Sequence, residues 1–422
     1  MAQATSGSVR AVNVILEYTD SLGNKEEIDI NQQGLLNLTF NRFNSKTEAG
    51  VLASIDLTMF DKTGLALLTM FQSNGGKLQI KYGFENDLSA TYVLNIVKFK
   101  STFNNLGSIS SVGAIGRESL TKFGPEIYKS GALINTILVR MAKRNNWDKG
   151  KLTKTYANTN REEYENIDVG DLKLPWPLHL LPDEPDIDFI YNKILPICKT
   201  TVTSSWSAET VFWDVTLFKP PGDERTKFYF NKYADRTTKR RVWNYKYGVS
   251  EQSNVISLTN TIDYTFLIKG LTIEVAAPAS AYLALDDVSL AEYYNTKVLN
   301  KWEAITGYFE EANLPVPDKD QFALVIEFVD MEEASDKDLD VRIFNEIRQA
   351  IYAINSIELE VVGNHKIMPK DIIDLEVKNK DGIDNTIKGL WKVVLIKESI
   401  GLSGFITKLN LVRESYDIVI EE

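Results

Sequence analysis

Apolar and polar side chains alternate along the first part of this chain, and this alternation limits its possible folds more than any other feature. From residue 9 to about residue 117, apolar side chains recur at every second position, as in β-strands buried on one face. Turn-forming residues at 20–24 and 74–76 separate the runs. Several antiparallel strands at this spacing predict a barrel or a sandwich. The clearest runs are 12–18, 36–40, 51–59 and 78–84.

The same alternation returns later in the chain. Residues 200–275 carry strand-like patterns and aromatic runs, so we expect a second antiparallel sheet there. The final segment adds four strand-like runs, and its glycine-containing loops at 379–382 and 402–404 suit hairpins. Two β modules are therefore predicted. The four runs are 357–362, 372–377, 390–398 and 405–412.

Helical periodicity appears between the β-rich parts. Apolar side chains four residues apart predict an amphipathic helix over 130–147, with further helices over 289–309 and 338–353. A short helix over 65–71 is also expected, and four prolines between residues 175 and 185 indicate a connector. The expected divisions are a first β module (9–123), a helix and proline-rich connector (124–199), the β-rich part of the second module (200–285), a helical segment (286–355) and the strands completing that module (356–422).

Composition narrows the functional classes. The chain has one cysteine, Cys198, and two histidines, His179 and His365, which removes disulfides and most histidine-based catalytic or metal sites. We therefore expect no catalytic residues, no cofactor and no metal. The net charge of −11 argues against a general phosphate-binding surface. No run approaches the roughly 20 apolar residues that span a bilayer, and the N-terminus lacks signal-peptide features, so no membrane insertion is expected.

An acidic group lies close to one of the histidines. Asp183, Glu184, Asp186 and Asp188 follow His179, and oxygen ligands at this density could bind Ca²⁺. The segment lacks the glycine turn and terminal glutamate of a calcium loop, so a solvated connector is the favoured interpretation. A paired-carboxylate cell-wall hydrolase is a further alternative, although no two carboxylates stand out from the rest.

A basic and aromatic stretch covers residues 225–246, where eight Lys or Arg residues meet one acidic residue, Asp235. Interleaved aromatic and basic side chains are typical of single-strand binders. The favoured interpretation is a pair of strands with inward aromatics and a basic loop at a subunit interface. An acidic partner and a nucleic acid are the alternatives. The candidate interface residues are Arg236, Lys239, Arg240 and Arg241.

The closing strands carry a family resemblance. After residues 356–371, the chain reads Gly-Leu-Trp-Lys-Val at 389–393 and Gly-Phe-Ile-Thr-Lys-Leu-Asn-Leu-Val-Arg at 404–413. This order resembles the C-terminal module of phage baseplate hub proteins, a family that includes the late control protein D group and the N-terminal part of type VI secretion spikes. The resemblance is sharp over about the last seventy residues and loose elsewhere.

The resemblance implies a fold and a function. The expected fold class is α+β, mainly antiparallel β, with two tube-like β-barrel modules and helical insertions. The expected function is non-enzymatic: a homotrimeric, pseudo-six-fold ring that joins the tail tube to the central spike in the virion tail baseplate, assembled in the host cytoplasm. Wedge proteins and the tape measure protein are further expected partners, and DNA is expected to pass through the channel without specific binding. Open sheet edges that close against neighbouring subunits give a physical reason for a ring.

Overall fold

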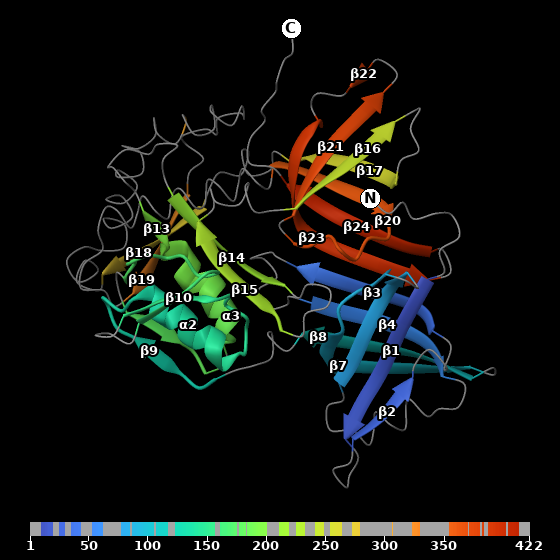
Figure 1. The fold of residues 1–422 in the computed structure, drawn as a ribbon, viewed down its shortest axis with the longest axis horizontal. Coiled ribbons are helices and arrows are strands. Elements are labelled where there is room, and N and C mark those ends of the chain that lie inside the picture. Colours follow the sequence, from blue (N-terminus) through green and yellow to red (C-terminus); the bar gives the residue numbers. More distant parts are fainter. Residues whose placement is uncertain are drawn as a thin grey trace.

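The structure is a computed structural model, and it shows two β modules that share one sheet beside a helix-containing middle part (Figure 1). All statements below refer to the residues that the structure describes. These are residues 10–19, 25–29, 35–43, 53–61, 77–84, 87–104, 107–116, 123–156, 161–174, 177–182, 184–200, 211–218, 225–232, 241–248, 254–263, 272–278, 306, 323–329, 354–369, 371–379, 382–383, 387–401 and 404–412.

The first β module is wholly antiparallel, in the order β3-β4-β8-β7-β5-β1-β2, with β6 beside β5. Its inward residues are those that the alternation predicted: Leu38, Leu57 and Leu78 are all fully buried. Burial of such side chains is the main stabilising contribution to a sheet of this kind. The strands are β1 (Arg10–Thr19), β2 (Lys25–Asp29), β3 (Leu35–Phe43), β4 (Ala53–Asp61), β5 (Lys77–Phe84), β6 (Asp87–Leu88), β7 (Tyr92–Asn104) and β8 (Gly107–Gly116).

The second β module contains all four strands expected near the C-terminus. Its order is β17-β20-β24-β23-β21-β16, with a parallel pair at β21 and β16 and a short strand β22 beside β21. Trp391 is fully buried at its core. The strands are β16 (Val242–Gly248), β17 (Val255–Ile262), β20 (Asn355–Val362), β21 (Ile372–Asn379), β22 (Gly382–Ile383), β23 (Gly389–Gly401) and β24 (Gly404–Val412).

One ladder joins the two modules. Strand β23 pairs antiparallel with β3 from Leu395 opposite Phe43 to Gly401 opposite Asn37, so a single sheet runs through both modules. The mainly antiparallel fold class is thereby confirmed. Among the described strands neither module closes into a hydrogen-bonded ring, because β16 and β17 approach each other without pairing and the path ends at β2 on the other side.

The middle part has a core of its own. Helix α2 packs there against three strand pairs, and Trp147 lies against Phe228 with ring centroids 5.2 Å apart. The segment therefore buries more apolar surface than its prolines suggest. Its elements are β9 (Glu126–Tyr128), α2 (Ile134–Arg144), β10 (Leu152–Tyr156), β11 (Arg161–Tyr164), β12 (Leu178–Leu180), α3 (Asp186–Phe189), η4 (Ile190–Ile194), η5 (Leu195–Ile197), β13 (Lys199–Thr200), β14 (Val211–Phe218) and β15 (Lys227–Lys232).

The helix expected over 130–147 is confirmed as α2, in a shorter form. It starts after Leu133 and ends at Asn145, and Asn146 then takes a left-handed conformation with φ of 58°. Asparagine tolerates that conformation, so the turn from the helix to Trp147 is explained by the residue type at position 146. No helix in the described part is long and apolar enough to span a membrane.

The remaining elements are a parallel pair, β18 (Thr272–Pro278) and β19 (Ala323–Val329). The helices expected over 65–71 and 338–353 lie outside the described residues, as does that over 289–309 apart from the helical Thr306. The domain divisions stay predictions.

Candidate functional site

The basic and aromatic stretch is divided between two cores. Strand β15 pairs with β14 in the middle part, whereas β16 pairs with β21 in the second module, so the expectation that the two form one strand pair is wrong. Phe228, Phe230 and Tyr245 are buried, which confirms that these aromatic side chains face inward and are closed to base stacking. Of the candidate interface residues, Arg241 is exposed just before β16, and the other three (Arg236, Lys239, Arg240) lie outside the described residues.

The acidic group near His179 is engaged in ion pairs. Asp186 is buried and accepts a 2.6 Å hydrogen bond from Nε of Arg144, while Glu184 pairs with Lys193 at 2.8 Å. Burial and nearby Glu184 raise the pKa of Asp188. Within the described residues, which omit Asp183, no group of three or more His, Cys, Asp or Glu side chains is arranged to hold a metal ion. Cys198 is buried in the core of the middle part.

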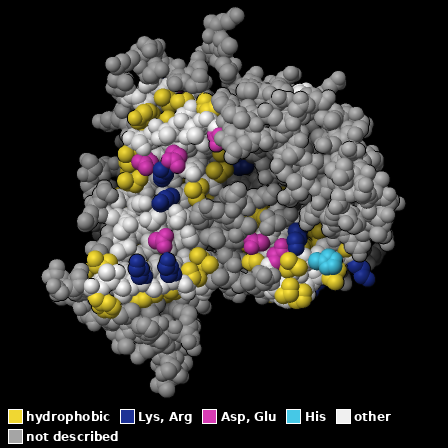
Figure 2. Space-filling view, turned by 180° about the vertical axis from the view of Figure 1, so that it is seen from behind, with side chains coloured by type: hydrophobic (Ala, Val, Ile, Leu, Met, Phe, Trp, Pro, Cys, Tyr) yellow, Lys and Arg dark blue, Asp and Glu magenta, His cyan; other side chains and the backbone are white. Residues whose placement is uncertain are grey.

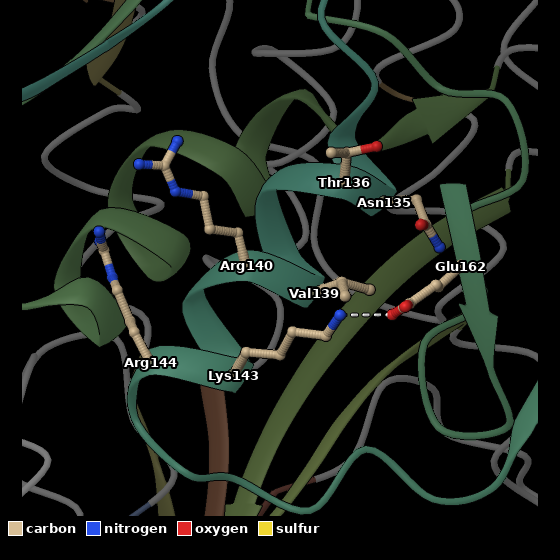
Figure 3. Close-up of a pocket in the computed structure, with 7 residues that line it drawn as sticks. All are labelled: Asn135, Thr136, Val139, Arg140, Lys143, Arg144 and Glu162. Carbon is tan, nitrogen blue, oxygen red and sulfur yellow. Dashed lines mark ion pairs between the residues drawn. The ribbon is translucent and has the colours of Figure 1, made fainter. Parts of the chain in front are cut away.

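A hollow of about 530 Å³ lies against α2 (Figure 3). Lys143 reaches across it to Glu162 at 2.6 Å (Figure 3), and Arg140 and Arg144 both pair with Glu126, at 2.8 and 3.0 Å. These cations are therefore neutralised by neighbouring carboxylates. The described lining of the hollow contains no histidine or cysteine. The lining residues are Asn135, Thr136, Val139, Arg140, Lys143, Arg144 and Glu162.

The sheet shared by the two modules presents one continuous outer face, defined by the register of seven strands from β20 to β7. Side chains with hydroxyl or amide groups are interspersed there with charged side chains of both signs (Figure 2). Apart from apolar members such as Ile109, Ile115 and Ile406, its residues are Glu358, Glu360, Lys408, Asn410, Lys397, Ser399, Asn37, Thr39, Asn41, Ser54, Asp56, Thr58, Ser111, Gly113, Lys98, Lys100 and Thr102.

Charges on this outer face are nearly balanced. Four lysines stand against three acidic residues, and Lys408 bridges to Glu358 at 2.6 Å, which raises the pKa of Lys408. The net acidity of the chain is therefore not concentrated here. These described residues do not form a negatively charged surface.

This face ends at two unpaired strand edges. Strand β7 pairs with β5 only from Tyr92 to Asn95, so its stretch from residue 96 to 104 has β8 as its one described partner. Strand β17 pairs only with β20 in the described ladders. Apolar side chains are exposed at both edges, with Phe103 on β7 at 68% exposure and Ile256 on β17 at 48%. Such edges are templates for pairing with another chain.

A buried ionic network lies where the two modules meet. Arg42 on β3 is 2.9 Å from Glu398 on β23, at 4% and 0% exposure, although the angles leave this atom pair without a hydrogen bond. The hydroxyl of Tyr82 on β5 donates to the other oxygen of Glu398. Burial and this carboxylate raise the pKa of Tyr82 well above its ordinary value. The network ties three strands of both modules together.

This network was not predicted from the sequence, although the positions of its two charged residues in their strands gave a signal for it. On β3, Arg42 lies on the inward-facing side together with Leu38 and Phe40. On β23, Glu398 lies on the inward-facing side together with Ile396 and Ile400. A charge at an inward position implies a buried partner. The alternation along one strand, however, does not identify which oppositely charged residue of the chain is that partner.

Comparison with known proteins establishes the fold. No family model and no curated protein matches the sequence. A tail protein from Neisseria meningitidis MC58 matches 97% of this chain and 98% of its own, at 9% identity and a TM-score of 0.50. The 43 kDa tail protein of prophage MuSo2 from Shewanella oneidensis matches 96% and 99%, at 10% identity and a TM-score of 0.53. The fold expected from the resemblance is thus confirmed along nearly the whole chain.

Proposed function

We propose that this chain, which has the fold of phage tail proteins, is a structural hub subunit in the baseplate of a contractile phage-like tail. In this proposal three copies form a ring that joins the tail tube to the central spike. The single observation that carries it is the sheet that runs through both modules and leaves β17 and residues 96–104 of β7 with one open edge each in the described ladders. The protein then works through its interfaces, without a reaction centre.

The two edges support a ring. The path from one edge strand to the other contains eight strands, in the order β17-β20-β24-β23-β3-β4-β8-β7. The two edge strands belong to different modules. A head-to-tail contact between unlike surfaces generates a closed ring when the rotation allows it. Pairing β7 of one copy with β17 of the next would hide both edges, and three copies with two modules each would give pseudo-six-fold symmetry. A six-fold tube could then meet a three-fold spike.

The outer face supports a passage role for this ring. Serine, threonine and asparagine side chains dominate its centre, and its charges nearly cancel. A wall of this kind offers a polyanion few fixed ion pairs, so DNA would pass without specific binding. The further proposed partners are the wedge proteins and the tape measure protein, and the proposed location is the virion tail baseplate, after assembly in the host cytoplasm.

Cysteine cross-linking tests the ring. Thr102 on β7 and Thr259 on β17 are exposed and lie on the same outer face, and the native Cys198 is buried. Oxidising a T102C/T259C or T102C/T261C variant at high protein concentration should give covalent dimers and trimers, with rings in electron micrographs. The matched control is T102C/T153C, since Thr153 is exposed on β10 away from the edges. Monomers alone from both test pairs, without rings, would overturn the proposal.

A further inference from the structure

A loop of the second module reaches onto the first module at the junction. We define the junction loop as residues 363–369, which follow β20. Its backbone is held on its own side, where Gly363 donates to the carbonyl of Phe405 at 2.9 Å and Asn364 donates to the hydroxyl of Thr407 at 2.8 Å. On the other side, Lys366 bridges to Asp87 of β6 at 2.7 Å. The loop therefore contacts both modules.

His365 sits at the centre of this contact and is buried, at 2% exposure. Its ring meets that of Tyr82 edge-on, with centroids 6.4 Å apart, and its carbonyl accepts a 3.4 Å hydrogen bond from Arg42. Its Nε2 makes no hydrogen bond within the described residues and lies 3.6 Å from a carboxylate oxygen of Asp87. The imidazole is thus enclosed between the modules, with no hydrogen bond from Nε2 to this carboxylate.

The charges around His365 balance only while the imidazole is neutral. Arg42 of β3 is matched by Glu398 of β23, and Lys366 of the loop is matched by Asp87 of β6. Tyr82, from β5, faces the ring with a phenol that stays protonated at ordinary pH. A proton on His365 adds a second buried cation beside Arg42. The nearest anion is half-exposed and already shared with Lys366.

We propose that the junction loop is an acid-released catch, in which protonation of His365 detaches the loop from the first module and loosens the contact between the modules. The geometry that carries this proposal is a buried imidazole, next to a buried arginine, at an interface between two parts of the chain. The proposal is independent of the ring, because it concerns contacts within one copy.

The direction and range of the effect follow from the protonation equilibrium. Burial lowers the pKa of His365 to about 4, with Arg42 and Lys366 acting in the same direction and Asp87 against it. The released imidazole titrates near its ordinary value of about 6.5. Between these values the released form binds more protons, so acidification favours release. Docking is insensitive to this group above about pH 7. The equilibrium shifts by about 150-fold at pH 4 and approaches its limit of about 300-fold only well below that pH.

The test uses the fact that the chain has only two histidines. In the full chain, NMR titration should show the His365 imidazole, assigned by its absence from the H365Q spectrum, with a pKa well below its ordinary value. Hydrogen exchange of the junction-loop amides, corrected for intrinsic rates, should show opening that increases by up to about tenfold per pH unit below pH 6.5. H365Q should remove that dependence, whereas the control H179Q should keep it. A His365 imidazole that titrates near 6.5, or an H365Q variant that keeps the dependence, would overturn the proposal.

Discussion

Removing one charge from the buried junction should weaken it far more than removing a similar charge from the surface. In E398Q the side chain keeps its shape and loses its charge, so Arg42 loses its counter-ion at 2.9 Å. Two of the other contacts of the guanidinium are long, at 3.4 Å to the carbonyl of His365 and 3.5 Å to the sulfur of Met368. Leaving one partner of a buried pair uncompensated costs about 3–5 kcal/mol. The amide oxygen of glutamine can still accept a hydrogen bond, so the lower end, about 3 kcal/mol, is expected.

Hydrogen exchange measures this cost locally, without assuming that a chain with several cores unfolds in one step. A loss of about 3 kcal/mol should accelerate exchange of the β3 and β23 amides roughly 100-fold, since about 1.4 kcal/mol corresponds to tenfold. The matched control is E358Q, which removes the exposed partner of Lys408 at 2.6 Å. Exposed pairs contribute about 0–1 kcal/mol, so exchange should change by no more than about fivefold.

The double replacement R42M/E398Q provides the opposite test. It removes both charges and keeps an amide oxygen as acceptor for the Tyr82 hydroxyl, and replacing a buried ion pair by uncharged residues of similar volume is often neutral or stabilising. Exchange at β3 and β23 should therefore return close to that of the parent chain. If E398Q exchanges no faster than E358Q, or if the double variant is worse than E398Q, then the reasoning about an uncompensated buried cation is refuted.

Two further substitutions test packing and pairing elsewhere. G363A should lower the melting temperature by several degrees, because a Cβ would overlap the buried Phe405 ring and cost about 1–3 kcal/mol of stability. G124A, with open space around its Cβ, should melt like the parent chain. D186N should accelerate amide exchange in α2, because it removes the buried ion pair with Arg144 at a cost of about 2–3 kcal/mol. D171N, which changes an exposed side chain, should leave the exchange in α2 unchanged. Equal effects of the two variants would contradict the role of burial.

The strands were predictable from the sequence because alternation is a local property. Leu38 and Phe40, or Leu409 and Leu411, reveal their shared face without knowledge of the partner strand. Pairing is different, since the β16–β21 ladder joins Val242 to Ile372 through contacts far apart in the chain. The core of the middle part could not be predicted either, because it too depends on contacts between residues far apart in the chain.

The candidate site shows the same division. The inward position of Glu398 could be read from β23 alone, whereas its position opposite Arg42 depends on the pairing of β23 with β3. The two unpaired edges also became visible only with the strand order, because an edge is defined by the neighbour that a strand lacks.

The ladder between β3 and β23 has a consequence for synthesis on the ribosome. The strands of the first module are complete at Gly116, but the segment that covers the edge of β3 ends only at Gly401. At about 5–20 residues per second, that edge waits on the order of tens of seconds for its neighbour. During this interval, the β23–β24 hairpin of another nascent chain can pair with β3 instead, giving a domain-swapped dimer. A high concentration of nascent chains should therefore favour entangled dimers, and a lower expression level should favour correctly folded single chains.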